Sequence, residues 1–405
     1  MKFKQLLSLA ALSLMAAATL TSCEDILGEW SRPTPAAVTP SAIAVTGITL
    51  DADATINVGE TKTLTATVAP DNATDKTVSW ISEDETIATV ADGVVTAVAA
   101  GTAVITATAN DGSGVKATCT VTVKIPGLLA GKFTINGSGK QVQFSQGNLQ
   151  ATTNDLGVTW TWAFAEHQWD YIGGTTDASD PNATTNNKIN DDGTVSDNGT
   201  VDLFGWVGAS SNWGDIRMYG ITSSGATNAK EGYGDGPTES LKSDWGTLAI
   251  SNGGNTANSG WRTLKSDEWT YLFNGRTSVT TRYCKATVNG VSGVVLFPDS
   301  YTHPDGVIPP TSTNTANAAF TTNSWTSDDW SKMEAAGCVF LPAAGERGGS
   351  YVSSVGSYGR YWSSSPESNV IYASHVNFFS DDLEAPTYHE RSYGHSVRLV
   401  RDVAE

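Results

Sequence analysis

Residues 45–124 consist mainly of short runs in which apolar and polar residues alternate. In a β-strand, successive side chains point to opposite faces, and threonine and valine suit a strand with one buried and one solvent-facing side. The pairs Asp92-Gly93 and Asp111-Gly112 interrupt these runs, as expected of tight turns. About seven strands within about 80 residues predict a small β-sandwich.

The same residues carry a series of motifs that resemble one family. In order along the chain they are Gly47-Ile48-Thr49-Leu50, Val58-Gly59-Glu60-Thr61, Val78-Ser79-Trp80, Ile87-Ala88-Thr89-Val90, Gly93-Val94-Val95-Thr96-Ala97 and Gly101-Thr102-Ala103. The series resembles the bacterial immunoglobulin-like group 2 domain over residues 45–123. This resemblance implies a domain that spaces a binding tip away from the cell surface. Trp80 and the valines are expected in its core, and no ligand is assigned to it.

The first 23 residues have the three zones of a secretory signal peptide. Lys2 and Lys4 precede an apolar run over residues 6–20, which is shorter than the ~20 residues that a membrane-spanning helix needs. The run ends in Leu20-Thr21-Ser22-Cys23, which resembles the lipobox of bacterial lipoproteins. We therefore expect residues 1–22 to be removed and Cys23 to be acylated; a plain signal peptide that leaves Cys23 unmodified is the alternative.

Residues 23–44 predict an extended tether, because Pro33, Pro35 and Pro40 stand among threonines and alanines that cannot bury a core. Glu24 and Asp25 resemble the export signals of surface lipoproteins of the Bacteroides group, although an ordinary solvated tether would look the same. The predicted location is the outer membrane. The lipid would be the only membrane contact, and the rest of the chain would be displayed at the cell surface.

The formal net charge of −18 and the pI near 4.6 argue against a nucleic-acid partner, because phosphates need a basic face. With Cys23 acylated, Cys119, Cys284 and Cys338 remain. Either Cys284 and Cys338 form a disulfide or all three are free buried thiols. No cofactor is predicted.

Residues 131–405 are predicted to form one α+β module that follows a linker over residues 124–130. One helix is expected over residues 266–273, with Ser266 as its N-cap, and another over residues 327–336, with Gly337 at its end. Strands are expected over residues 284–288, 291–297, 338–341, 372–379 and 396–400. The chain as a whole is therefore predicted to be mainly β, with an Ig-like sandwich before the α+β module.

Five motifs of this module occur in a characteristic order. They begin with Gly260-Trp261-Arg262-Thr263-Leu264 and continue with residues 293–298, 340–345, 359–365 and 394–400. The order resembles a paralogous surface-protein family of Fibrobacter and Bacteroides, whose module is similar to the C-type lectin fold, over about residues 133–401. Five apolar residues of these motifs and of the predicted helix have the type and spacing of core residues: Trp261, Trp269, Trp362, Val397 and Leu399. Arg262 and Arg398 are expected to brace loops through hydrogen bonds to carbonyl groups.

No catalytic or metal-binding pattern is visible. The five histidines lack an HExxH motif or helical spacing, and Gly-x-Ser-x-Gly is absent. The calcium-binding tripeptides of sugar-binding C-type lectins are also absent. The acidic run over residues 190–202 could offer oxygens to calcium, but solvated turns explain it better. We therefore predict a protein that is not an enzyme and has no metal site.

The segment over residues 351–395 is rich in tyrosine, histidine, serine and asparagine, a composition that resembles antibody loops. In the expected strand at residues 372–379, Val376 and Phe378 share one face. If that face is buried, His375, Asn377 and Phe379 point toward a partner. The predicted ligand-binding residues are Tyr358, Arg360, Tyr372, His375, Asn377, Phe379, Tyr388, His389, Tyr393 and His395. Glycine- and serine-rich extracellular loops without a binding role have a similar composition.

Together these features predict a cell-surface lipoprotein that binds an extracellular protein or glycan without catalysis. The Ig-like domain would act as the spacer and the lectin-like head as the binding module. The main alternative is a carbohydrate-active enzyme, or an accessory glycan-binding protein of polysaccharide uptake. A structural subunit of a surface fibre would need an open strand edge or a donor strand.

Overall fold

The computed structural model describes residues 41–172, 195, 197–206, 244–348, 351–369, 372–391 and 393–403. It is mainly β, with 43% strand and 8% helix, as predicted. The predictions for the leader, for Cys23, for most of the tether and for residues 190–194 and 196 of the acidic run lie outside the described residues. Within the described residues, no helix has the length and hydropathy that crossing a membrane requires.

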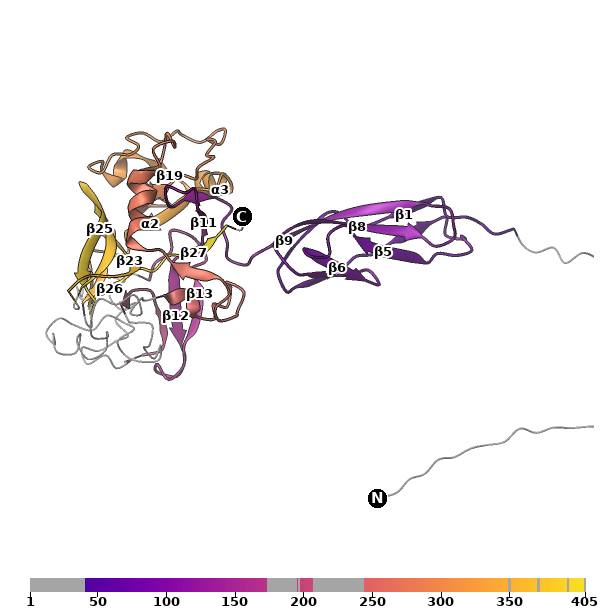
Figure 1. Cartoon of the computed structure of the whole chain (residues 1–405), viewed down its shortest axis with the longest axis horizontal. Helices are drawn as coiled ribbons and strands as arrows, with labels where there is room; N and C mark the ends of the chain where they lie inside the picture. Colours follow the sequence, from indigo (N-terminus) through magenta and orange to yellow (C-terminus); the bar gives the residue numbers. More distant parts are fainter. Residues whose placement is uncertain are drawn as a thin grey trace, which may run out of the picture.

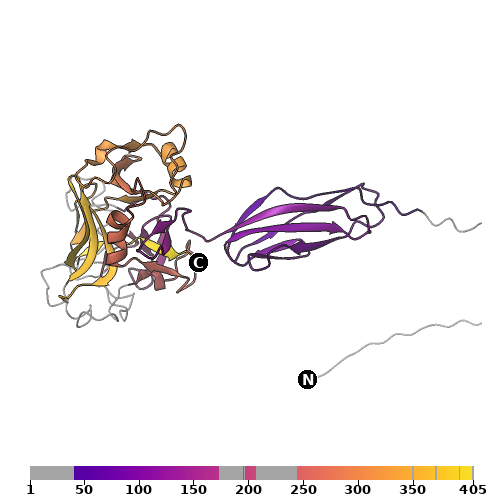
Figure 2. The same cartoon turned by 45° about the horizontal axis from the view of Figure 1, so that its top comes forward.

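The N-terminal strands form an elongated sandwich that lies beside the rest of the molecule (Figures 1 and 2). One sheet has the order β2-β9-β8-β5, a second has the order β3-β7-β6, and β1 pairs with β4. The bounds are β1 Gly47–Thr49, β2 Ala54–Asn57, β3 Thr61–Thr63, β4 Thr67–Ala69, β5 Val78–Ser82, β6 Ala88–Ala91, β7 Val94–Ala97, β8 Gly101–Ala109 and β9 Lys116–Lys124.

Alternation along the strands matches the expected period of two. On β8, Ala103, Ile105 and Ala107 are buried while the residues between them are partly exposed. The turn between β6 and β7 has Asp92 at φ 50° and Gly93 at φ 81°, the left-handed conformation that an Asp-Gly hairpin turn needs. Trp80 departs from the prediction, because it is only partly buried at the margin of the core. Two of the valines that were expected in the core, Val94 and Val98, are also 39% and 47% exposed.

The remaining strands form the head, a set of small sheets. The first is β10 Phe133–Thr134, β11 Gln141–Phe144, β27 Leu399–Asp402 and β16 Trp261–Thr263, and the second is β13 Thr161–Phe164, β12 Leu149–Thr153 and β14 Gly199–Val201. The third is β15 Phe204–Gly205, β26 Gly394–His395, β21 Glu346–Gly348 and β22 Tyr351–Ser353. The fourth is β19 Ser324–Trp325, β17 Tyr283–Val288, β18 Val291–Leu296 and β20 Val339–Pro342. The fifth is β23 Gly359–Pro366, β24 Tyr372–Phe379 and β25 Asp382–Glu390.

Two predicted helices are present. The first begins as α2 (Ser266–Thr270) and continues as a π-helical turn, η5 (Tyr271–Gly275). Ser266 is its first helical residue and not its cap; the backbone N–H of Lys265 instead donates to the Glu268 carboxylate at 2.8 Å. The second, α3 (Ser327–Ala335), is capped by Thr326 and is followed by Gly337 at φ 91°. Two short 3-10 turns, η4 (Trp245–Thr247) and η6 (Phe320–Thr322), complete the helical elements of the described residues.

The expected strands also form, with one difference at the C-terminal end. There the predicted strand at residues 396–400 is interrupted. The short strand β26 ends at His395, residues 396–398 form an irregular connection, and β27 begins at Leu399. The N–H groups of Ser396 and Leu149 still form backbone hydrogen bonds, with the carbonyls of Arg360 and Val397 respectively. This irregular path turns the chain from one sheet to another and positions His395.

The predicted linker at residues 124–130 is packed against the head. Leu129 is buried in the head core, and its N–H donates to the carbonyl of Phe144 at 2.9 Å. The N–H of Gln146 donates to the carbonyl of Gly127 at 2.7 Å, and Leu128 bridges to Ser145. The head therefore begins before residue 131, because two leucines of this segment supply apolar surface that the head buries.

The expected core side chains of the head are buried, each less than 5% exposed: Trp261, Trp269, Trp362, Val397 and Leu399. The two arginines differ from each other. Arg398 bonds side-chain amide carbonyls, with 2.8 Å to Gln168 Oε1. Among the described residues, Arg262 bonds no carbonyl group; it forms a bidentate ion pair with Glu268 at 2.7 and 2.9 Å and a further ion pair with Asp402. Cys119, Cys284 and Cys338 are free and buried, so no disulfide links Cys284 to Cys338.

Candidate functional site

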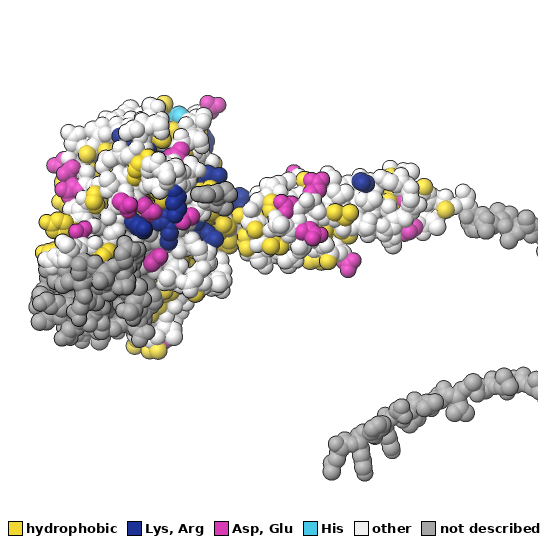
Figure 3. Space-filling model, in the orientation of Figure 1, with side chains coloured by type: hydrophobic (Ala, Val, Ile, Leu, Met, Phe, Trp, Pro, Cys, Tyr) yellow, Lys and Arg dark blue, Asp and Glu magenta, His cyan; other side chains and the backbone are white. Residues whose placement is uncertain are grey.

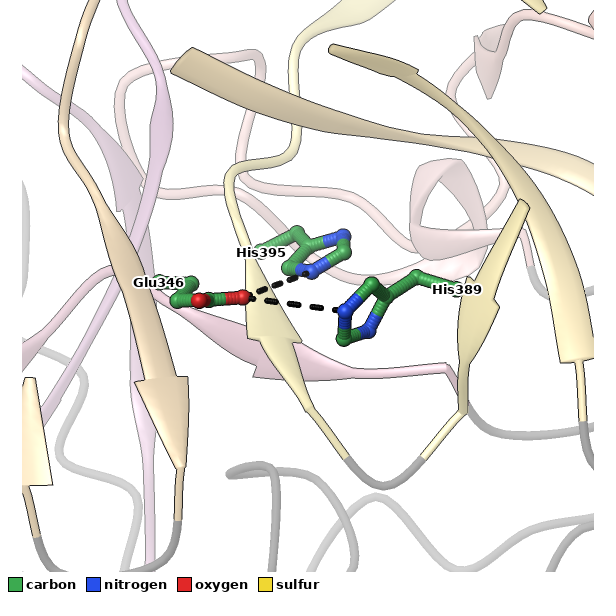
Figure 4. A group of neighbouring side chains, drawn as sticks. All are labelled: Glu346, His389 and His395. Atoms are coloured by element: carbon green, nitrogen blue, oxygen red, sulfur yellow. Dashed lines mark ion pairs between the residues drawn. The ribbon is translucent and has the colours of Figure 1, made fainter. Parts of the chain in front are cut away.

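Five polar side chains from five strands meet at one place in the head, which we call the histidine cluster. They are Glu346 of β21, Arg360 of β23, His375 of β24, His389 of β25 and His395 of β26. Figure 4 shows His389 and His395 pointing toward the Glu346 carboxylate from two other strands. Four of these residues were predicted as ligand contacts, but no prediction brought them together with Glu346.

The short strand β26 places His395 at the centre of this cluster. Phe204 of β15 pairs with His395, and Arg347 of β21 pairs with Gly394. A Cβ atom at Gly394 would lie 2.8 Å from the Arg347 Cβ and 2.9 Å from the Leu203 carbonyl oxygen, so glycine permits this close approach of three segments. The following residue, Ser396, bridges to Tyr361 of β23 and so holds His395 against that sheet.

Trp362 forms the apolar wall of the cluster. Its ring stacks on His395 with centroids 4.1 Å apart and lies edge-on to His375 at 5.7 Å. The three imidazoles contact one another, with centroid separations of 4.8 Å for His375 and His395 and 5.1 Å for His389 and His395. Trp362 was predicted as scaffold only, and this stacking adds a second role for it.

Burial differs across the cluster. His395 is fully buried and His375 is 3% exposed, whereas the side chains of His389, Glu346 and Arg360 are 27%, 16% and 15% exposed. A molecule approaching from solvent would therefore reach His389 before His375 or His395. The site is closed on its His395 side and accessible on its His389 side.

The Glu346 carboxylate is the centre of charge in the cluster. Its Oε2 atom lies 3.8 Å from His395 Nε2 and 4.0 Å from His389 Nε2, and it accepts a hydrogen bond from Arg360 Nη1. The Nη1 atom of Arg360 also lies 3.3 Å from His389 Nε2. The Nε atom of Arg360 donates a hydrogen bond to the side-chain oxygen of Asn377 at 3.3 Å. Its guanidinium stands over the ring of Tyr358 at 5.3 Å.

Several imidazole nitrogens in this cluster have no hydrogen-bond partner within the part of the chain that the structure describes. Both ring nitrogens of His395, and the Nδ1 atoms of His375 and His389, are buried without one among the described residues. An unsatisfied buried polar atom costs about 1–3 kcal/mol, so native structures rarely keep several together without a reason.

All three imidazoles are held in the neutral form at neutral pH. Burial lowers the pKa of His375 well below its ordinary value, and the neighbouring His395, His389 and Arg360 lower it further. Burial, then His389 and Arg360, lower the pKa of His395 in the same way. Burial and Arg360 lower the pKa of His389, while the Glu346 carboxylate acts in the opposite direction.

The structure contradicts the prediction that His375 and Asn377 face a partner. Val376 and Phe378 are fully buried, as expected of the core face, but His375 and Asn377 are only 3% and 8% exposed. The alternation with a period of two correctly separated Val376 and Phe378 from His375 and Asn377 on opposite faces of β24. The assumption that the second face is open was wrong, because Trp362 and His395 cover His375 there and Arg360 bonds Asn377. His395 is likewise buried and cannot contact a large partner directly.

The predicted ligand-binding tyrosines and Phe379 are more exposed than His375 and His395, and they lie on or next to the sheet of β23, β24 and β25. Tyr388 of the edge strand β25 is 62% exposed and packs edge-on against Tyr372 at 5.3 Å. Tyr393 packs edge-on against His389 at 4.4 Å. At the other end of the sheet, the ring of Tyr358 stacks on Phe379 at 5.0 Å, and these two side chains are partly exposed.

Glu346 was missed because nothing in the local sequence marks it. It lies on a three-residue strand that begins just after the motif at residues 340–345, and only the pairing of β21 with β26 brings it to the histidines. In chemical terms, two neutral imidazoles and a carboxylate can hold a metal ion, and a carboxylate beside imidazoles can also accept or donate a proton. The ligand atoms of Glu346, His389 and His395 all lie within 4.8 Å of one another.

Known proteins are similar to this chain over limited segments. An α-L-arabinofuranosidase of Bifidobacterium longum subsp. longum is 52% identical over 88 residues, which are 21% of this chain and 8% of that enzyme. An Ig-like virion protein of Serratia phage KSP90 is 48% identical over 21% of this chain and 34% of that protein. A lacto-N-biosidase of Bifidobacterium bifidum is 40% identical over 29% of this chain and 11% of that enzyme. The chain thus spans about a third or less of these relatives.

One solved structure, of an S-layer protein, aligns with 25% of this chain and 16% of its own at 18% identity and a TM-score of 0.19. The family match is more definite. Residues 44–121 match the family described as bacterial Ig-like domain (group 2), which agrees with the motif order and with the strands β1 to β9. The β-sandwich of this chain is therefore a bacterial Ig-like domain of group 2.

Proposed function

We propose that this protein is a lipid-anchored binding protein of the bacterial outer membrane, displayed at the cell surface. In this proposal the Ig-like domain is a spacer and the head is a lectin-like module that binds an extracellular protein or glycan. The arrangement of the parts supports it. The sheet of β23, β24 and β25 lies on the side of the head away from the sandwich (Figures 1 and 2). An anchor before the sandwich would therefore leave this sheet pointing outward.

The exposed aromatic edge of that sheet carries the proposal. Tyr388 is 62% exposed on the edge strand β25, with Tyr372 against it and Tyr393 beside the accessible His389. Tyrosine gives a rigid contact area with a polar tip, and exposed tyrosines are common anchors of binding surfaces. We define the binding edge as Tyr372, Tyr388 and Tyr393.

The edge strand itself is poorly suited to pairing with another strand. Pro386 lies in the middle of β25, and Asp382, Glu384 and Glu390 add negative charge along it. Proline and charge are the usual features that keep an edge strand from recruiting a partner strand. This favours recognition through side chains over assembly into a fibre.

The test is a comparison of binding by three forms of a soluble chain that starts after Cys23. The wild type is applied to glycan and protein arrays, and its best ligand is titrated. The triple variant Tyr372→Ala, Tyr388→Ala, Tyr393→Ala is expected to bind that ligand at least tenfold more weakly, because tyrosine is enriched among the few interface residues whose truncation costs about 2 kcal/mol or more. Ile308→Ala, at a residue 74% exposed elsewhere on the head, is the control and should bind like the wild type. Equal affinity of the triple variant would exclude the binding edge.

A second candidate is a glycan-active or glycan-uptake role. The observation in its favour is that similar Ig-like segments occur in an arabinofuranosidase and a lacto-N-biosidase. Glu346 would be the carboxylate to test, because it is the one acid in the histidine cluster. Release of reducing sugar from polysaccharides by the wild type, and its loss in Glu346→Gln, would favour catalysis over binding alone.

A further inference from the structure

The histidine cluster contains a set of atoms that suits a metal ion. Two imidazole nitrogens and one carboxylate oxygen form the protein ligand set of many catalytic zinc sites, in which a water or another molecule fills the fourth position. The same set also binds other divalent first-row transition ions. We propose that Glu346, His389 and His395 form a binding site for a divalent transition-metal ion, with Zn²⁺ as the ion that fits best.

The distances are close to those of a metal site. Glu346 Oε2 lies 3.8 Å from His395 Nε2 and 4.0 Å from His389 Nε2, and all the ligand atoms lie within 4.8 Å of one another. Ligand atoms around a tetrahedral zinc ion at bond lengths of 2.0–2.1 Å are about 3.3 Å apart. For a metal ion to bind, the ligand atoms must therefore move closer together by about 0.5 to 1.5 Å.

Hydrogen bonding gives an independent reason. His395 is fully buried, and neither of its ring nitrogens has a hydrogen-bond partner among the described residues. A metal ion coordinated by Nε2 would provide one of these two nitrogens with a partner. The Nδ1 atoms of His375 and His389 also lack a partner among those residues, and the His375 ring is 4.8 Å from His395. His375 thus packs against one of the proposed ligands and supports the site without belonging to the ligand set.

Arg360 is the group that opposes a metal ion. Its Nη1 atom bonds Glu346 and lies 3.3 Å from His389 Nε2, so its charge stands where a cation would bind. The guanidinium has other partners, because Nε donates to Asn377 and the Tyr358 ring lies beneath it. Metal binding would require Arg360 to leave Glu346 and remain on these two groups. Arg360 therefore lowers the metal affinity, and its removal should raise that affinity.

The competing explanation is that the three imidazoles only fill space against Trp362, with Glu346 neutralised by Arg360. Metal titration separates the two explanations. The soluble chain that starts after Cys23 is stripped with a chelator, dialysed, and titrated with Zn²⁺ by calorimetry and with Co²⁺ by visible absorption. We expect one ion per chain and the intense d–d bands of a four- or five-coordinate Co²⁺ site.

Substitutions then identify the ligands. Glu346→Gln and His389→Gln, at partly exposed positions, should each weaken Zn²⁺ binding at least tenfold, and circular dichroism will show that they remain folded. Arg360→Met should strengthen binding at least tenfold, a change that a purely structural role for the histidines does not predict. His167→Ala removes a surface histidine whose side chain is 48% exposed and serves as the matched control.

The proposal is overturned if the wild type binds no Zn²⁺, or if Glu346→Gln and His389→Gln bind it as tightly as the wild type. It is also overturned if Arg360→Met weakens binding. None of these measurements uses an extracellular ligand, so the metal site and the binding edge can fail independently of each other.

Discussion

His395 illustrates how burial changes the chemistry of a single side chain. An exposed histidine titrates near pH 6.5, but this ring is fully buried against Trp362, and His389 and Arg360 add positive charge nearby. The same conditions apply to His375. Both rings stay neutral in the folded chain at a pH where they would be protonated in the unfolded chain.

This difference predicts a pH-dependent stability of the metal-free head. Below about pH 6.5 the unfolded chain binds protons that the folded chain does not, so stability is complete above that pH and falls as the pH falls toward the lowered folded pKa. Each such histidine contributes a slope of up to about 1.4 kcal/mol per pH unit. Thermal unfolding with chelator, followed by tryptophan fluorescence, should therefore show a lower Tm at pH 5.5 than at pH 7.5.

The matched variants for this prediction are His375→Gln and His303→Gln. The first removes a buried titrating ring and should reduce the pH dependence of Tm. The second replaces a ring that bonds Tyr301 and the Val307 carbonyl away from the cluster, and should leave most of the dependence in place. A Tm that is the same at both pH values, or a slope unaffected by His375→Gln, would contradict this account.

At the scale of elements, one ion pair joins the strand β16 to the helix α2. Arg262 bonds both oxygens of Glu268 and also reaches Asp402 of β27, and the Arg262 and Glu268 side chains are 18% and 10% exposed. Asp402 in turn pairs with Lys140, where both side chains are more than 40% exposed. Figure 3 shows basic and acidic side chains mixed on the face of the head beside the sandwich.

The difference in burial predicts different energetic roles for the two pairs. Arg262→Ala leaves the Glu268 carboxylate without its cation in a mostly buried position and should lower the free energy of unfolding by about 3 kcal/mol. Lys140→Ala breaks an exposed pair and should cost less than about 1 kcal/mol. Denaturant unfolding of the two variants measures both values, and a similar loss in each would refute a special role for Arg262.

For the whole molecule, the boundary between the two domains lies at β9. The hydrophobic clusters of the Ig-like domain draw only on residues between Val45 and Val123, whereas Leu129 belongs to the head core and Ile125 and Leu128 pack against a second head cluster. A head fragment that begins at residue 131 therefore lacks part of its own core.

This boundary predicts a difference between two fragments of the head. A fragment of residues 125–405 should unfold like the head in the full chain. One of residues 131–405 should be less stable by about 2–5 kcal/mol, the usual cost of removing a buried leucine. Leu129→Ala in the full chain is the matched point substitution and should reproduce much of the loss. Equal melting temperatures of the two fragments would show that residues 125–130 act only as a linker.

Local patterns in the sequence were sufficient to predict the Ig-like sandwich, both helices of the head and most of its strands. They were sufficient because alternation, caps and Asp-Gly turns depend on neighbours within a few residues. The alternation along residues 372–379 correctly placed Val376 and Phe378 on one face of the strand, and that face is buried. The alternation could not predict whether the opposite face, with His375 and Asn377, is exposed to water, because its exposure depends on which distant segments of the chain pack against it.

The tertiary structure alone decided the burial of His375 and Asn377, the attachment of residues 125–130 to the head, and the meeting of Glu346 with His389 and His395. Each of these depends on strands far apart in the sequence, such as β21 and β26, whose pairing leaves no periodic signal in either segment. A residue's type and spacing determine which face of an element it occupies, and only the packing of distant elements determines whether that face becomes surface, core or site.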